Sequence, residues 1–124
     1  MDILISNSGD KPIYEQITSQ IKGMIMSGKL AAGEPLPSIR HMAKELRVSV
    51  ITTKRAYEDL ERDGFIETIP GKGSFVAERN LALIREEQLK AVEARLAEAV
   101  DIAKRSGITL DELTEMMKLL YEEE

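Results

Sequence analysis

The chain has 124 residues, of which 43% are hydrophobic and 31% charged, and it carries a formal net charge of −5 and no cysteine. These values suit one domain with an appendage. They exclude disulfides, thiolate chemistry and a histidine-rich metal cage, since His41 is the only histidine. No apolar run of about 18 residues exists to span a membrane. We therefore expect a cytoplasmic protein that has no cofactor and makes no membrane contact.

The first predicted helix follows a polar arm, residues 1–11, which we expect to be loose or β-like. Isoleucine recurs every four residues from Ile13 to Ile25, a spacing that places one apolar stripe on a helix of about four turns. Pro12 suits the first helical position, where its missing N–H has no cost. Residues 29–37 contain a glycine and two prolines, so we expect a connection there.

Two short helices across a tight turn are predicted next. Ser38 is a good N-cap for the first of them, and the turn falls at Arg47 and Val48. Ser49 then caps a helix that runs to about Arg62. Apolar periodicity assigns the inward positions of the two helices to Ile39, Met42, Ala43, Leu46, Ala56, Tyr57 and Leu60.

A β-hairpin is predicted to follow the helices. Its strands are expected at residues 65–68 and 74–77, joined by the glycine-rich segment 69–73. A two-stranded hairpin is marginal by itself, so it must pack on the helices. Helix, turn, helix and wing form the arrangement that places one helix in a DNA major groove. We therefore expect residues 1–78 to form a DNA-binding domain, a winged helix-turn-helix that is mainly α with a small β-hairpin wing.

Residues 79–124 change character and predict a two-helix C-terminal segment. No glycine or proline lies between Asn80 and Arg105, and a capping box of Thr109 and Glu112 begins a last helix. Each helix carries an apolar face that we expect to serve dimerisation, the first at heptad spacing. These faces consist of Leu89, Val92, Leu96, Ala99, Ala103, Leu113, Met116, Met117 and Leu120. The alternative is that the first face packs back on its own winged domain.

The negative charge is unevenly distributed along the chain. Residues 37–55 hold five basic side chains, and Glu45 is their only acidic neighbour. Local charge decides phosphate binding, because salt screens exposed charges beyond roughly 8–10 Å. A basic patch on an acidic protein predicts weak non-specific DNA binding, with discrimination left to specific contacts.

The candidate DNA contacts lie at the start of the second and third helices and at the wing tip. Lys54 can reach a phosphate or a guanine edge, and Val50 can touch a thymine methyl. Thr52 and Thr53 can contact phosphate or a thymine methyl, although capping explains them nearly as well. Lys72 between two glycines suits a tip that approaches the minor groove. The full set is Ser38, Arg40, Ser49, Val50, Thr52, Thr53, Lys54, Gly71, Lys72 and Gly73.

Two other charged residues are predicted to stay off the DNA. Arg55 is expected to pair with Asp59, four residues along the same helix. His41 is expected to be an exposed helix residue.

The stretch from Pro12 to Val76 resembles the winged helix-turn-helix domain of GntR-type bacterial transcriptional regulators. The resemblance implies DNA binding, and it implies that Arg40 contacts phosphate or guanine. Many members have arginine at the positions of Val50 and Lys54, so base assignments do not carry over. Some relatives have histidine where Pro70 stands. The motifs that carry the resemblance are PIYEQI (12–17), GxxxxGxxLPSIR (28–40), VSxxTxxRAYEDLERDGFIE (48–67) and GKGSFV (71–76).

Only 46 residues follow Glu78. A C-terminal segment this short resembles that of the YtrA-type subfamily rather than that of members with a large ligand-binding domain. The subfamily's C-terminal helices serve dimerisation, and its members often repress operons for ABC transporters. The resemblance implies a homodimeric repressor of its own operon that binds a pseudo-palindromic operator. The small-molecule effector stays unknown.

Three other functional classes compete with a repressor. An enzyme is not expected, because the sequence has no Ser-His-Asp set, no phosphate loop and no metal cluster. A winged-helix protein-protein interaction module and a transcriptional activator are the alternatives.

Overall fold

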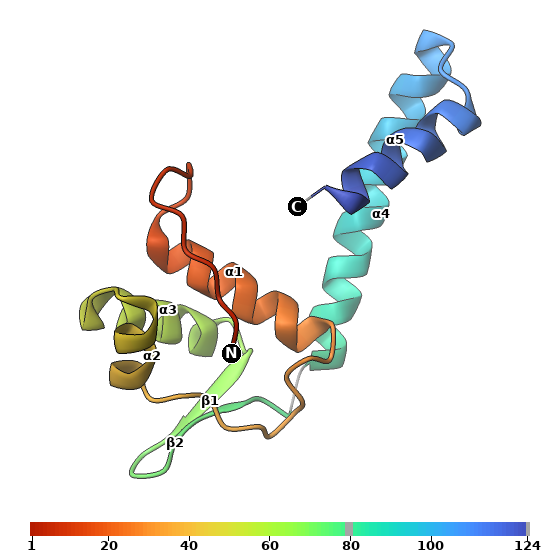
Figure 1. Ribbon diagram of the computed structural model, residues 1–124. Coiled ribbons are helices and arrows are strands. Elements are labelled where there is room, and N and C mark those ends of the chain that lie inside the picture. The colour runs from red at the N-terminus through yellow and green to blue at the C-terminus, as the bar shows by residue number, and fades with distance from the viewer. Residues whose placement is uncertain (79–80, 124) are drawn as a thin grey trace. The chain divides into compact units, whose positions relative to one another are not determined.

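The computed structural model describes residues 1–78 and 81–123 and divides the chain into two compact units, Met1–Ile84 and Arg85–Glu124 (Figure 1). The division falls inside the first turns of a helix rather than before it. Residues 79 and 80, where the predicted second segment begins, lie outside the described residues. Within the described part of the chain, no helix has the length and apolarity needed to cross a membrane.

The first unit contains α1 (Ile13–Met26), α2 (Ile39–Leu46) and α3 (Val50–Arg62), followed by β1 (Ile66–Ile69) and β2 (Gly73–Val76). The strands pair in antiparallel register, with Ile66 opposite Val76, and form the wing. The predicted mainly α fold with a hairpin wing is confirmed. Strand positions differ from the prediction by one residue, and α1 begins at Ile13 because Pro12 takes the extended conformation of an N-cap.

The core of the first unit lies where α1 and α2 pack on α3. Ile17, Ile21 and Leu60 are fully buried there, as the apolar periodicity predicts. Burying side chains of this size stabilises by roughly 1.5–3 kcal/mol each. The wing closes one side of this core through Phe65 and Ile66.

The segment expected to be a simple connection also pairs with the edge of the two-stranded sheet. The Gly33 N–H donates to the Val76 carbonyl at 2.8 Å, the Val76 N–H donates to the Glu34 carbonyl at 2.8 Å, and the Leu36 N–H donates to the Ser74 carbonyl at 2.9 Å. Residues 33–36 therefore lie along the outer edge of β2. Proline is tolerated in this segment because an edge strand leaves alternate N–H groups unpaired.

The N-terminal arm is tied to α1 by two glutamine side chains. The Leu4 N–H donates to Oε1 of Gln20 at 2.9 Å, and Nε2 of Gln20 donates to the Leu4 carbonyl at 2.7 Å. Gln16 makes the same pair of bonds with the backbone of Ser6, both at 2.8 Å. Each amide thus pairs with the backbone as a neighbouring strand does, and Ile3 is buried in the core. Residues 3–6 of the arm are therefore held in place rather than loose, and residues 7–11 form a turn and bends.

The second unit is helical. Helix α4 (Leu81–Ser106) begins in the first unit, where Leu81 and Ile84 pack against the core, and it continues through the second. Helix α5 (Leu110–Glu122) begins at the predicted capping box, in which the Glu112 N–H donates to Oγ1 of Thr109 at 3.1 Å. Both helices thus occur where the sequence predicts them.

Candidate nucleic-acid interface

The turn between α2 and α3 is fixed by backbone conformation. Arg47 has φ 57° and ψ 44°, the left-handed conformation that ends a helix, and it is the one non-glycine residue with positive φ among those described. The Val48 N–H then donates to the Ala43 carbonyl at 3.0 Å. Ser38 caps α2 by accepting the His41 N–H at 3.1 Å. Both ends of α2 are therefore satisfied locally.

Tyr57 holds α3 against the start of α2. Its hydroxyl donates to the Pro37 carbonyl at 2.7 Å, and its side chain is buried. Burial raises the pKa of the Tyr57 phenol well above its usual range, so the phenol stays protonated and remains a donor. The bond sets the position of the Ser38 cap relative to α3.

The hydroxyl groups in the first turn of α3 are engaged within the helix. Oγ of Ser49 accepts the Thr52 N–H at 3.0 Å and donates to Oγ1 of Thr52 at 2.8 Å. Thr53 is fully buried, and its hydroxyl donates to the Ser49 carbonyl at 3.1 Å. The structure therefore corrects the expectation that Thr53 contacts DNA, because its side chain does not reach the surface.

The surface of this turn is aliphatic. Val50 is 44% exposed and Ile51 is 81% exposed. Ile51 lies within the helix predicted from Ser49 to about Arg62 but is not among the candidate DNA contacts predicted from the sequence. The available signal was its position outside the inward stripe of Ala56, Tyr57 and Leu60.

The basic side chains of α2, the turn and α3 are exposed. Four of them form no ion pair with any residue in the described ranges 1–78 and 81–123. These four are Arg40, Lys44, Arg47 and Lys54. Unpaired cations on one helix-turn-helix are available to phosphate oxygens.

Arg55 differs from this group and from its prediction. Its guanidinium lies over the Tyr14 ring at 3.7 Å from the centroid, a cation–π contact that joins α3 to α1. Asp59, its predicted partner, pairs with Arg62 at 2.9 Å instead. The predicted Arg55–Asp59 pair is therefore wrong. His41 is exposed as expected, with Nε2 at 2.8 Å from Oε1 of Glu45.

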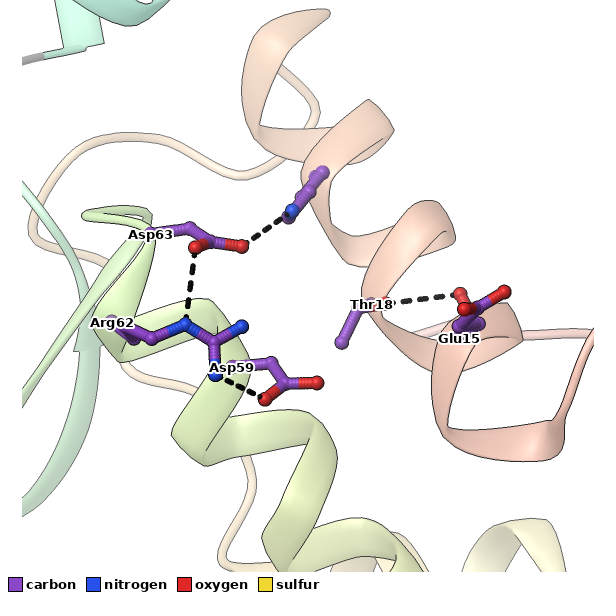
Figure 2. Close-up of polar contacts among 6 residues, drawn as sticks. Glu15, Thr18, Asp59, Arg62 and Asp63 are labelled. Carbon is purple, nitrogen blue, oxygen red and sulfur yellow. Dashed lines mark hydrogen bonds and ion pairs between the residues drawn. The ribbon is translucent and has the colours of Figure 1, made fainter.

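A chain of ion pairs fixes the far end of α3 (Figure 2). Nζ of Lys22 lies 2.9 Å from Oδ2 of Asp63, and Nε of Arg62 lies 3.5 Å from Oδ1 of the same carboxylate. The hydrogen bond from Lys22 lowers the pKa of Asp63. Because Lys22 belongs to α1, these contacts tie α1 to the C-terminal end of α3, the helix whose first turn holds the candidate base contacts.

The wing tip is a tight, exposed turn. The Lys72 N–H donates to the Ile69 carbonyl at 2.9 Å, and Gly71 and Gly73 have φ of 78° and 109°. Such values favour glycine, and they present Lys72 at the end of the hairpin. Hydroxyls of Thr68 and Ser74 meet at 2.9 Å across the strands.

The chain is similar in sequence and in fold to known transcription regulators. The chain is 33% identical over 116 residues to the HTH-type transcriptional repressor YtrA of Bacillus subtilis (strain 168), covering 94% of this chain and 89% of the relative. Its fold matches a transcriptional antiterminator from Listeria monocytogenes EGD-e with a TM-score of 0.73 and 30% identity, over 98% of this chain and 91% of that one.

The DNA-binding domain of AraR, solved in complex with operator ORX1, matches with a TM-score of 0.55 and 26% identity. That match covers 62% of this chain and 96% of the AraR domain. The profile of the bacterial regulatory proteins of the gntR family matches residues 13–76, which span α1, the helix-turn-helix and the wing. This family consists of transcription regulators rather than enzymes, and the chain belongs to it.

Proposed function

We propose that this DNA-binding regulator is a sequence-specific repressor that binds a pseudo-palindromic operator as a homodimer. The observation that carries the proposal is the unpaired basic surface of α2, the turn and α3, next to the exposed first turn of a capped helix. A helix of this kind fits the major groove, where side chains meet base edges and cations meet phosphates. The regulator acts in the cytoplasm, on the DNA of the cell.

The roles of the DNA-contacting residues follow from their positions. Lys54 on α3 and Arg40 on α2 reach phosphates or guanine edges, and Lys72 on the wing reaches the minor groove or its phosphates. The remaining positions keep side chains small, so that the backbone can approach the phosphates. They are Ser38, Ser49, Thr52, Gly71 and Gly73.

The second unit supports assembly with a second copy of the chain. Apolar side chains on α4 and α5 are exposed in the single chain, among them Leu89, Val92, Leu96, Met116, Met117 and Leu120. A helical unit that leaves so many large apolar groups in water is stabilised by covering them. Ala99 is exposed beside them and Leu113 is half-buried. Ala103 departs from the predicted seam because it is buried within the chain, so we leave it out of the interface.

Repression of the chain's own operon completes the proposal. YtrA of Bacillus subtilis is a transcriptional repressor, and its match extends over both units of this chain. The AraR domain, which was solved with operator DNA, supports a DNA ligand for the first unit. Occupation of the promoter by the dimer excludes RNA polymerase. An operon for an ABC transporter is the target that the YtrA-type resemblance suggests.

The test is fluorescence anisotropy of the intact protein on the DNA upstream of its own gene, with excess competitor DNA. We expect tight binding that resists competitor and falls steeply with salt, because cation–phosphate contacts release counterions. Arg40→Ala and Lys54→Ala should each weaken binding, and Lys54→Ala should lower the salt slope by about one. Lys90→Ala, which changes a basic residue of α4, is the matched control.

Two results would contradict the proposal. Binding to all DNA with equal affinity would remove the sequence-specific reading. Failure to bind any fragment from a genome-wide selection would favour a protein-interaction module. Promoter activity with and without the protein separates a repressor from an activator.

A further inference from the structure

The first turn of the reading helix offers few free hydrogen-bonding groups to a base. The Ser49 and Thr53 hydroxyls donate within the helix end, and Oγ1 of Thr52 accepts from Ser49, so the Thr52 hydroxyl proton is the one free donor among these three groups. Hydrogen-bonded readout at this turn therefore has little to use before Lys54. The chemical character of the outward surface is set by aliphatic groups instead.

Two consecutive aliphatic side chains occupy that surface. Ile51 is one of the most exposed large apolar side chains of the first unit, and Val50 beside it is exposed to nearly half. Residues three apart share a helix face, so Ile51 lies next to Lys54. An apolar side chain beside an unpaired cation suits a ligand that carries both negative charges and exposed apolar groups.

The major groove of DNA has both. Phosphates line it, and among the atoms that base pairs present there, the C5-methyl of thymine is the apolar one. Resting on the proposed function, we propose that Val50 and Ile51 are specificity-determining residues that read thymine methyl groups in each operator half-site. The 3.6-residue turn of an α-helix points consecutive side chains about 100° apart, so the two side chains contact methyls at different positions of the half-site.

The experiment begins with an operator selected from a randomised duplex pool by the intact protein. Each thymine is then replaced singly by uracil, which removes the methyl and keeps base pairing and the O4 acceptor. At one or two positions per half-site we expect affinity to fall about fourfold, the equivalent of about 0.8 kcal/mol for one buried methyl-sized group. Uracil at other positions should have no effect.

Variants connect the effect to the two side chains. In Ile51→Ala or Val50→Ala, thymine and uracil should bind equally at the contacted position, while the variant still binds the operator. Alanine has a higher helix propensity than either residue, so both variants should keep the thermal midpoint of the parent protein. Leu4→Ala removes an aliphatic side chain that is 82% exposed on the N-terminal arm, and it should leave the uracil effect intact.

The outcomes separate this inference from the proposed function. If no operator is selected, both fall. If an operator is selected and uracil is tolerated at every position, DNA reading stands and the methyl contact is overturned. If the uracil effect persists in both alanine variants, another residue reads the methyl. Tolerance of uracil combined with loss of regulation in Ile51→Ala cells would assign the pair to a protein partner instead.

Discussion

The hydroxyl of Tyr57 donates to the Pro37 carbonyl at 2.7 Å, and this bond joins the reading helix to the residue before the cap of α2. Pro37 precedes α2, and Tyr57 lies in the middle of α3. The bond therefore fixes the relation between the two helices that carry Arg40 and Lys54.

Tyr57→Phe should lower the free energy of unfolding by about 0.5–1.5 kcal/mol, because the partly buried Pro37 carbonyl loses its donor. Urea denaturation measures the change. Tyr121→Phe is the matched control, since Tyr121 is 91% exposed and should tolerate loss of its hydroxyl. Equal stability of the two variants would show that the Tyr57 bond contributes nothing.

Gln20→Ala should release the N-terminal arm. The variant removes both bonds to the Leu4 backbone, so the Leu4 amide should exchange with solvent at least about fivefold faster, as loss of about 1 kcal/mol of local stability implies. Hydrogen exchange followed by NMR measures the rate. Gln88→Ala on α4 is the control, and unchanged Leu4 exchange in Gln20→Ala would mean that buried Ile3 and the Gln16 bonds hold the arm without Gln20.

Asp63→Asn should destabilise the protein at neutral pH but not in acid. The hydrogen bond from Lys22 lowers the pKa of Asp63 in the folded chain, so its stabilisation is present above about pH 4 and is lost as pH falls through the folded value. Because the pair is partly exposed, the loss at pH 7 should stay below about 1 kcal/mol.

Unfolding free energies measured from pH 7 to pH 2 test this pattern. The curves of the variant and parent proteins should converge at the acid end. Asp2→Asn, a change of charge in the arm, should run parallel to the parent throughout. A difference between Asp63→Asn and the parent that is independent of pH would refute the charged interaction.

Leu96→Asp should convert the proposed dimer to a monomer. Leu96 is 42% exposed in the single chain, and covering that part of a leucine contributes about 1 kcal/mol for each of two copies. Sedimentation equilibrium measures the mass. Lys90→Asp alters charge one residue after the seam position Leu89 and should stay dimeric. A Leu96→Asp protein of dimer mass would place the interface elsewhere.

Local features of the sequence predicted much of this fold. The isoleucine spacing of α1, the caps Ser38 and Ser49, and the Thr109–Glu112 box depend on residues within one or two turns of each other. Non-local contacts account for most of the errors. Residues 33–36 pair with β2 despite Pro35. The sequence did not predict this pairing because β2 lies far along the chain.

The candidate site shows the same division. Arg55 does not pair with Asp59, four residues along the helix, because its guanidinium stacks on the ring of Tyr14 from α1. The burial of Thr53 was available from the sequence, since it precedes the inward Ala56 and Tyr57 by three and four residues. The exposure of the Val50 and Ile51 side chains could not be predicted in the same way, because it depends on how α1, α2 and α3 pack together.

The edge pairing of residues 33–36 with β2 gives the wing a second attachment, because this segment leads directly into the Ser38 cap of α2. A wing held on both sides cannot swing independently of the helices. In the proposed complex, Lys54 at the major groove and Lys72 at the minor groove are two points on one frame, and we expect them together to sense the shape of the duplex. Groove width varies with base sequence, so we expect the frame to favour operators whose resting shape already fits it, including at base pairs that no side chain touches.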